Sequence, residues 1–424
     1  MQWRTPWCNL SVTALLIGIL CTILAACGST GTSGQSHITL TFASWQGGAA
    51  GDAYQAVIKS YEKLHPNVTI RYEVSDATNY TTILNTHFSA GDSSDIIAFS
   101  PTSYNKAPYV KAGDLADLSD QPWVAHLQAS AKVTAVADED PGKSYALPVV
   151  QDMGGVIYNK DIFSKLNLQI PTTWSQFLQV CAAIKASGVA PIAVGAKDGW
   201  PLEQFLYNEL VNTVYRDDPG FHAKQVAGAA TYTGSTGWRQ AIDNLVALKP
   251  YFNAGFSSST FANTGDVLAT GKAAMTVNGD FTLQPTETSN PNIHLGIFPL
   301  PYVQGSSVKP NLTSFVDVTL GISAKSQHVD TAKQFLQYFA QPDVMASFLT
   351  QRQGLATLDN VSSYKVDPAL TDALPMLQGQ SVNEAVIGTT SNVETAMWKD
   401  AQAVLTGTMT QMQMLQDLDT VFKS

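Results

Sequence analysis

The chain has 424 residues and a formal net charge of −10, with 34 acidic against 24 basic side chains. An acidic chain without a basic cluster lacks the electrostatic footprint of a nucleic-acid-binding protein. Apolar residues make up 45% of the composition, as in an ordinary globular protein. The length exceeds what one hydrophobic core usually supports, so we expect two domains.

The first residues have the pattern of an export signal. Arg4 precedes an apolar run that is short for a membrane-spanning helix and has no basic stop after it. The run ends in LAAC, which resembles the bacterial lipobox; an ordinary cleaved signal with a chance cysteine is the alternative. We predict a lipoprotein signal peptide over residues 1–26, lipidation of Cys27 and a flexible tether over residues 27–36. The protein would then be exported and lipid-anchored to the outer face of the bacterial cell membrane.

Cysteine usage does not indicate disulfides. Cys8, Cys21 and Cys27 belong to the predicted signal and its cleavage site, so Cys181 is the only cysteine of the mature chain. Cys181 shares a helical face with the apolar residues of TWSQFLQVCAAIKASG, and we expect it to be a buried structural thiol.

Strand and helix signals alternate in the first part of the chain. ITLTFASW predicts a strand, and the apolar spacing of AGDAYQAVIKSYEKLHP predicts a helix that Pro66 closes. VTIRYEV is a second strand, NYTTILNTHFSAG a short helix ended by Gly91, and SDIIAFSP a buried strand stopped by Pro101. This order predicts an α/β domain with a largely parallel sheet covered by helices.

The later chain returns to the same pattern. ALPVVQDMGGVIYNKDIF predicts a strand, a Gly pair, a second strand and a helix from about residue 161, and a helix-rich region follows to about residue 268. GKAAMTVNGDF, IHLGIFPLP and FVDVTLGIS read as strands, DTAKQFLQYFAQ as a helix, and the chain ends in helices. A β/α pattern that recurs late suggests that the chain crosses between two domains more than once.

Catalytic and metal-binding patterns are weak. The seven histidines never fall in a zinc-binding spacing, and the sequence has no nucleophile elbow or phosphate loop. We therefore expect no catalytic residue, no metal site and no cofactor. A glycosidase-like carboxylate pair stays open as an alternative, because such pairs are set by three-dimensional spacing.

Residues suited to ligand binding gather where predicted strands end. In open α/β sheets, ligands bind in the crevice outside the carboxyl ends of the strands. A sugar packs its C–H face on an aromatic ring, and planar amide or carboxylate groups bond its hydroxyls. The candidate ligand-binding residues are Trp45, Gln46, Tyr80, Phe99, Ser100, Asp152, Trp200, Asn278, Asp280 and Phe281.

Structural roles are the alternatives at these positions. Trp45 could cap a core, Trp200 could anchor a helix start, and Asp152 could only cap a backbone amide. Asn278 to Asp280 is also a common turn sequence. By contrast, Met397 and Trp398 lie in a helical apolar stripe, and we expect them in the core.

The basic residues narrow the chemical class of the ligand further. The mature chain has four arginines, Arg71, Arg216, Arg239 and Arg352, and none lies at a predicted strand end. Arginine is the usual bidentate partner of carboxylate and phosphate, so its scarcity argues against an anionic ligand. A neutral, hydroxyl-rich ligand fits better.

Three segments resemble one family over most of residues 37–424. ALPVVQDMGGVIYNKDIF, GKAAMTVNGDF and FVDVTLGISAKSQHVDTAKQFLQYFA together resemble the extracellular solute-binding proteins of ABC importers, in the carbohydrate class that is maltose-binding-protein-like. The resemblance rests on Pro148, Asp152 and Tyr158-Asn159-Lys160 in the first segment. In the second it rests on Gly271, Ala274, Met275 and Gly279, with Phe281 where the family has tryptophan.

The resemblance implies a two-lobed, periplasmic-binding-protein-like α/β fold whose hinge the chain crosses more than once. The N-terminal lobe would comprise residues 37–149 and 302–353, and the C-terminal lobe residues 150–301 and 354–424. By position, Asp152 would bond sugar hydroxyls, and Phe99 and Phe281 would take the places of stacking tryptophans. The smaller rings do not support maltodextrin specificity.

The resemblance also implies a function. A monomeric, lipid-anchored binding protein would capture a neutral mono- or oligosaccharide and deliver it to the permease subunits of an ABC importer. A surface-anchored enzyme acting on glycans and a sensor-type sugar-binding lipoprotein are the alternatives. A polyol, osmolyte or peptide ligand also stays open.

Overall fold

The computed structural model describes residues 37–100, 106–136, 140, 142–302, 308–379 and 381–423. The predicted signal peptide, Cys27 and the tether lie outside the described residues. Within the described part of the chain, no helix combines the length and the apolar character needed to cross a membrane.

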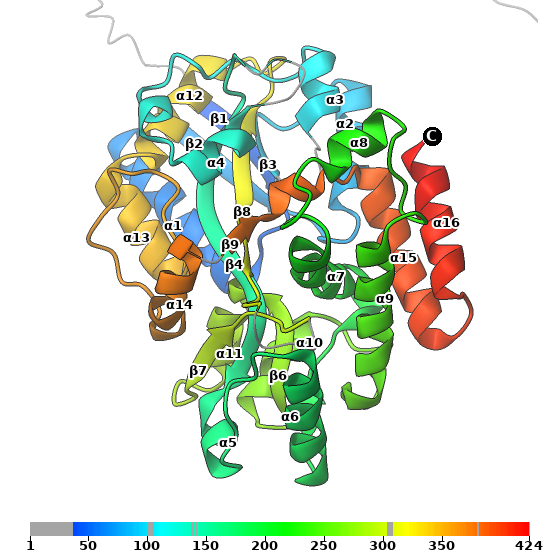
Figure 1. Cartoon of the computed structure of the whole chain (residues 1–424). Coiled ribbons are helices and arrows are strands. Elements are labelled where there is room, and N and C mark those ends of the chain that lie inside the picture. Colours follow the sequence, from blue (N-terminus) through cyan, green and yellow to red (C-terminus); the bar gives the residue numbers. More distant parts are fainter. Residues whose placement is uncertain are drawn as a thin grey trace, which may run out of the picture. The chain divides into compact units, whose positions relative to one another are not determined.

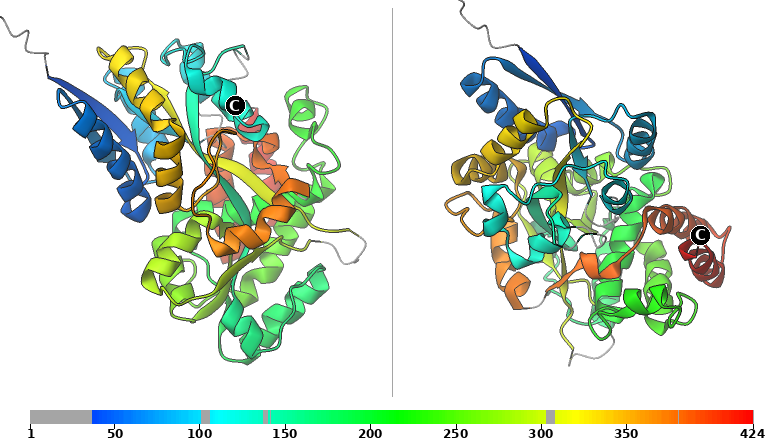
Figure 2. Two further views of the ribbon diagram at one scale, coloured as in Figure 1. Left: turned by 90° about the vertical axis from the view of Figure 1, so that its left-hand side faces the viewer. Right: turned by 90° about the horizontal axis from the view of Figure 1, so that it is seen from above.

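The predicted β-α-β-α-β start of the chain is confirmed. Strand β1 pairs in parallel with both β2 and β3, and α1 buries Tyr54, Val57, Ile58 and Tyr61 at helical spacing. Helices α1, α12 and α13 lie side by side (Figure 2). The elements of this part are β1 (Ile38–Ser44), α1 (Gly48–Leu64), β2 (Val68–Val74), α2 (Tyr80–Ala90), β3 (Ile96–Phe99), α3 (Lys106–Lys111), α4 (Ala129–Ala135), α12 (Val329–Phe339) and α13 (Pro342–Arg352).

Two long strands continue this sheet. Strands β4 (Ala146–Asn159) and β8 (Leu312–Ile322) pair antiparallel in the order β2-β1-β3-β8-β4-β6-β5, with β7 on β4 and β9 on β8. Figure 1 shows β4 running beside β8 from the level of β1 and β3 down to β6 and β7. The remaining strands are β5 (Ala190–Ile192), β6 (Ala273–Gly279), β7 (Leu295–Phe298) and β9 (Ser381–Asn383).

The Gly pair in β4 was expected to separate two strands, and this expectation is wrong. Gly154 and Gly155 lie inside one continuous strand. A Cβ atom at Gly155 would come within 2.8 Å of the carbonyl oxygen of Phe298 on β7. The glycine therefore allows a close strand approach rather than a break. The pairs β3–β8, β4–β8 and β4–β6 are antiparallel, whereas β1–β2, β1–β3, β5–β6 and β8–β9 are parallel.

The second half of the described chain is mostly helical. Helices α7, α9, α15 and α16 pack together and bury Trp238, Met397 and Met414. Cys181 is fully buried on α6, as predicted. These elements are α5 (Lys160–Lys165), α6 (Trp174–Ala186), α7 (Trp200–Thr213), α8 (Phe221–Val226), α9 (Thr236–Leu248), α10 (Ala262–Ala269), α11 (Leu283–Ser289), α14 (Pro368–Gly379), α15 (Ser391–Thr406) and α16 (Gln411–Phe422), with short 3-10 helices η5 (Asp280–Thr282) and η6 (Glu384–Ile387).

The described residues form two large hydrophobic cores. The first core joins β1, α1, α12 and α13, and the second joins β6, α6, α7, α9, α15 and α16. Strand β4 serves both, because Leu147, Val149 and Val150 belong to the first core and Val156 to the second. The chain therefore passes between cores within β4. The predicted lobe boundaries themselves stay a prediction.

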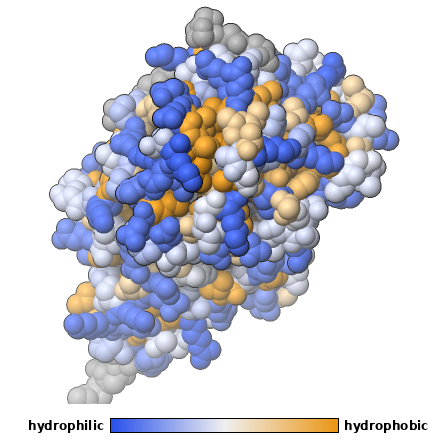
Figure 3. Space-filling model, turned by 90° about the horizontal axis from the view of Figure 1, so that it is seen from below, coloured by the Kyte–Doolittle hydropathy of each residue, from blue (hydrophilic) through white to orange (hydrophobic). Residues whose placement is uncertain are grey.

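Exposed apolar side chains are scattered. Leu64 on α1, Ile170, Val226 on α8 and Met412 on α16 are exposed and come from separate elements. Figure 3 shows one face, where hydrophobic residues are interspersed with hydrophilic ones. Single exposed apolar residues of this kind are normal and mark no docking surface by themselves.

The second core contains an acidic side chain. Glu209 on α7 is buried and accepts a hydrogen bond from Nδ2 of Asn244 on α9 at 2.9 Å. Burial raises the pKa of the Glu209 carboxyl to about 8. The folded protein therefore holds a proton that the unfolded chain releases near its ordinary pKa of 4.5.

We predict that this carboxyl makes stability fall as pH rises. The stabilisation that the protonated Glu209 carboxyl provides is fully present below the pKa of this group in the unfolded chain. It is lost as pH rises through the pKa of the group in the folded protein, by up to about 1.4 kcal/mol per pH unit. Thermal unfolding of residues 37–424 between about pH 5 and 9 measures this slope. Glu209→Gln should flatten it, whereas Glu73→Gln, at an exposed position, should not. Equal slopes in the two variants would contradict the assignment.

Candidate functional site

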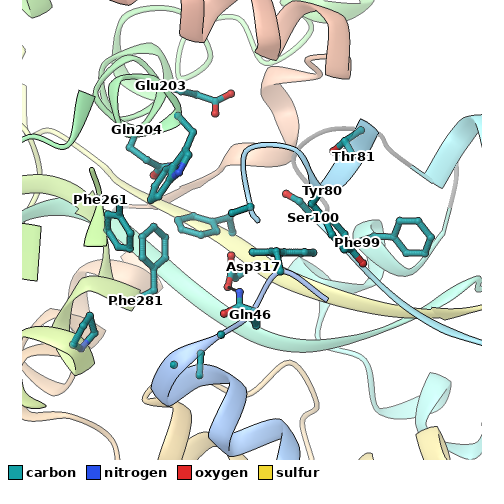
Figure 4. Close-up of a pocket in the computed structure, with 18 of the residues that line it drawn as sticks. Gln46, Tyr80, Thr81, Phe99, Ser100, Glu203, Gln204, Phe261, Phe281 and Asp317 are labelled. Atoms are coloured by element: carbon teal, nitrogen blue, oxygen red, sulfur yellow. Dashed lines mark hydrogen bonds between the residues drawn. The ribbon is translucent and has the colours of Figure 1, made fainter. Parts of the chain in front are cut away.

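A cavity of about 420 Å³ lies between elements of the first core and elements of the second. Seven of the ten predicted ligand-binding residues line it, whereas Asp152, Asn278 and Asp280 do not. Figure 4 shows Tyr80 and Ser100 on one side of Asp317, and Phe261 and Phe281 on the other. The predicted residues that line the cavity are Trp45, Gln46, Tyr80, Phe99, Ser100, Trp200 and Phe281.

The first aromatic wall consists of Trp45 and Tyr80. Their ring centroids are 5.1 Å apart, and the Tyr80 hydroxyl donates to the carbonyl oxygens of Ala43 and Ala98. These bonds fix Tyr80 against the ends of β1 and β3. Trp45 is only half-buried, so part of its indole packs on the core and part faces the cavity.

The second aromatic wall consists of Trp200, Phe261 and Phe281. The centroid of Trp200 lies 4.6 Å from that of Phe261 and 5.9 Å from that of Phe281. Phe281 follows β6, and its ring occupies the space where a Cβ atom at Gly279 would lie. Glycine at 279 therefore lets the ring fold back beside the strand.

Phe99 is placed differently from the other aromatic candidates. Its side chain is 1% exposed, and its ring centroid lies 5.7 Å from that of Tyr109. In Figure 4 its ring points away from Asp317. The backbone of this strand end borders the cavity, and the ring itself belongs to a core cluster with Leu84, Phe88 and Tyr109.

Three side chains form the polar floor of the cavity: Gln46, Asp317 and Arg352. Nη2 of Arg352 donates to Oδ2 of Asp317 at 2.9 Å, and Nε2 of Gln46 donates to the same oxygen at 3.0 Å. The same Nη2 also donates to Oδ2 of Asp152 at 2.9 Å. Arg352 is 2% exposed, so its charge is balanced inside the protein by two carboxylates.

The three predicted polar residues outside the cavity lining, Asp152, Asn278 and Asp280, lie on β4, on β6 and directly after β6. Asp152 is completely buried, and burial raises the pKa of its carboxyl to about 6 against the opposing effect of Arg352. Burial, followed by the Asp152 charge, raises the pKa of Asp280 well above its ordinary value. Asn278 accepts a hydrogen bond from the backbone amide of Gly279 through its own Oδ1. In this structure Asp152 and Asp280 interact with each other, and Asn278 bonds the backbone of β6.

Burial alone lowers the pKa of the Arg352 guanidinium, but the carboxylates of Asp152, Asp317 and Asp280 together raise it above its ordinary value. Arg352 therefore stays charged, and its charge is already neutralised. This arrangement agrees with the predicted exclusion of an anionic ligand, because the arginine has no free charge to offer.

Several lining residues were not among the predicted ones. Asp317 is a lone acid in the buried run FVDVTLGIS, a signal that could have identified it. Glu203, Glu384 and Glu394 lie in helical segments whose position over the cavity depends on tertiary packing.

The expectation of a core position is confirmed for Met397, which is fully buried, and wrong for Trp398, which lines the cavity. The apolar stripe of α15 runs through Val393, Met397 and Val404, and Trp398 stands one position off it. Its Nε1 donates to Oε2 of Glu203 at 2.6 Å.

Comparison with known proteins identifies the family. Residues 45–346, more than half of the chain, match the family described as bacterial extracellular solute-binding protein. The chain belongs to this family. It is therefore a binding protein of the transporter type rather than an enzyme.

Curated relatives and solved structures agree with this assignment. The chain is 24% identical over 406 residues to the multiple sugar-binding protein of Streptococcus mutans, covering 92% of this chain and 94% of the relative. It is 22% identical to the melibiose/raffinose/stachyose-binding protein MelE of Bacillus subtilis, covering 77% and 76%. A Bacillus licheniformis sugar transporter protein in complex with stachyose matches with a TM-score of 0.77 at 21% identity, covering 90% and 98%. The expected periplasmic-binding-protein-like fold is thereby confirmed.

We predict that replacing Arg352 destabilises the folded protein, because the polar floor depends on its charge. Arg352→Gln would leave the carboxylates of Asp152 and Asp317 without their counter-charge, and breaking a buried pair costs about 3–5 kcal/mol. The loss should be smaller near pH 5 than near pH 8, because a protonated carboxyl needs no partner. Denaturant unfolding of residues 37–424 measures it.

Arg71→Gln is the matched control, because Arg71 is exposed on β2. If Arg352→Gln lowers the free energy of unfolding no more than Arg71→Gln does, the buried triad contributes little to the stability of the fold.

Proposed function

We propose that this protein is the substrate-binding component of an ABC importer and captures a mono- or oligosaccharide in the cavity. The observation that carries the proposal is the pair of aromatic walls on either side of a floor of planar polar groups. Sugar rings have an apolar C–H face and a rim of hydroxyls, and this cavity offers a surface for each.

Individual contacts follow from this geometry. Trp45 would stack on one sugar face, and Trp200 with Phe281 on another, since all three are partly exposed to the cavity. Gln46 and Asp317 would bond neighbouring hydroxyls with their remaining donor and acceptor capacity. The printed names of the two curated relatives, both sugar-binding proteins, support a sugar as the ligand.

The lobes would move about β4, which serves both cores, and about β8, which pairs with it. We place the N-terminal lobe at residues 37–149 and 302–353 and the C-terminal lobe at residues 150–301 and 354–424, with β4 and β8 in the crossing segments. A ligand that touches both aromatic walls makes more contacts in a closed form than in an open one. Such differential contact shifts the population toward closure, which the permease would recognise.

The mature protein would act as a monomer at the membrane surface. Removal of residues 1–26 and lipidation of Cys27 would hold it on the outer face of the cell membrane, beside its permease. The LAAC sequence and the Gly/Ser-rich tether support this placement.

Tryptophan fluorescence of residues 37–424 provides the test. Three of the six tryptophans of this segment, Trp45, Trp200 and Trp398, line the cavity. Titration with neutral mono-, di- and trisaccharides should give a saturable change with at least one sugar, which is then recovered unaltered. No response to any sugar of the panel, by fluorescence or calorimetry, would refute the proposal.

We predict that Trp45→Ala weakens binding of that sugar. Loss of one buried aromatic surface costs about 1–3 kcal/mol, or roughly 5- to 150-fold in Kd. Tyr251→Ala is the control, because Tyr251 is a half-buried aromatic outside the cavity lining. Unchanged affinity in Trp45→Ala would assign Trp45 to the core alone.

A further inference from the structure

Glu203 is bonded to an aromatic ring in the cavity lining. It lies in the first turn of α7 and is 6% exposed, and its Oε2 accepts a hydrogen bond from Nε1 of Trp398 on α15 at 2.6 Å. Both residues line the cavity. Because Nε1 is the only polar atom of an indole, this bond sets the direction in which the edge of the ring points.

Helix α15 has other contacts that place it here without this bond. Gln402, one turn after Trp398, donates through Nε2 to the carbonyl oxygens of residues 196 and 197. A Cβ atom at Gly199 would lie 2.8 Å from Cβ of Trp398, so the two segments approach closely at the start of α7. Gly199 has a φ of 79°, which glycine adopts without strain. What Glu203 adds is therefore the orientation of the indole.

The same segment holds the neighbouring aromatic wall. Oδ2 of Asp198 accepts a hydrogen bond from the backbone N–H of Phe261 at 2.7 Å, and the ring of Phe261 packs against that of Trp200. Among the described residues, no ring contact joins Trp398 to this wall, so its indole is a separate aromatic surface. Residues 198–203 therefore order two neighbouring aromatic surfaces, each through one carboxylate.

The carboxyl group of Glu203 is not itself open to a ligand. Its Oε1 is enclosed and has no hydrogen-bond partner in the described part of the chain, and its Oε2 is bonded to the indole. Trp398, by contrast, is partly exposed. Any effect of Glu203 on a bound sugar would therefore pass through the ring that it orients.

We infer that Glu203 is a positioning residue of the binding site and holds Trp398 as a third aromatic surface for the sugar. The inference rests on the proposed function and adds a surface that belongs to neither of the two walls. A ring that is held in place before the sugar arrives loses little conformational freedom on binding. Without its acceptor, the indole N–H would turn toward another acceptor or toward water, and the sugar would have to order the ring.

Two variants of Glu203 test the hydrogen bond. Glu203→Leu replaces the carboxyl group by methyl groups and cannot accept a hydrogen bond, whereas Glu203→Gln keeps a carbonyl oxygen that can. Calorimetry of residues 37–424 would measure Kd for the tightest-binding member of the neutral sugar panel, which includes galactose, melibiose and raffinose. We expect Glu203→Leu to weaken binding about tenfold, which corresponds to about 1.4 kcal/mol, and Glu203→Gln to retain most of the affinity.

Trp398→Phe shows whether Glu203 acts through the indole N–H. This variant keeps an aromatic surface and removes the donor, so adding Glu203→Leu to it should cause no further loss of affinity. Glu209→Leu is the matched control, because Glu209 is a buried glutamate of the same helix outside the cavity lining, and it should leave Kd unchanged. Thermal unfolding of each variant checks that it is folded.

The indole itself provides a readout that needs no sugar. In protein with isotope-labelled tryptophan, the N–H resonance of Trp398 is the one that Trp398→Phe removes. Glu203→Leu should move this resonance upfield by more than Glu203→Gln does, because only the first variant removes the acceptor.

The outcomes separate this inference from the proposed function. If Glu203→Leu leaves the resonance in place or does not weaken sugar binding, the inference is overturned while the sugar-binding proposal stands. An equal loss of affinity in the Trp398→Phe background would also overturn it, because Glu203 would then act by another route. If no sugar of the panel binds to the unchanged protein, both fall.

Discussion

One buried cation organises the cavity. Arg352, at the end of α13, donates to carboxylates on β4 and on β8, the two strands that cross the middle of the sheet. Its burial is tolerated because the carboxylates of Asp152 and Asp317 offset its charge. Because Gln46 bonds the same Asp317 oxygen, the end of β1 is tied into this triad. Two crossing strands, one helix end and the first strand are thus held by a single charge.

The cavity lining combines two electrostatic environments. The floor is internally neutralised and offers directional hydrogen bonds, whereas burial raises the pKa of Glu384 and of Glu394, which also line the cavity, well above the ordinary value. The aromatic walls add surface without charge. A ligand would therefore be positioned by shape along the aromatic walls and by hydrogen bonds at the floor.

Sequence reasoning found the elements that local patterns determine. The alternating strands and helices, the burial of Cys181, and the strand-end positions of Trp45 and Phe281 follow from periodicity and from the rule for strand ends. It missed what depends on long-range packing. Gly155 looked like a break because its neighbour Phe298 is far away in sequence, and Glu384 gave no signal because only η6 packing on α7 places it at the cavity.

The order of the sheet also constrains how the chain can fold. Strand β3 has β8 as its antiparallel neighbour, with Ile96 opposite Ile322, so the first core lacks a central strand until most of the chain has been made. Closing so long a loop is entropically costly, and contacts of such separation make folding slow. A nascent chain would thus stay unfolded long enough for an export signal of the predicted kind to act. The pairing that completes the first core would in that case form only after export.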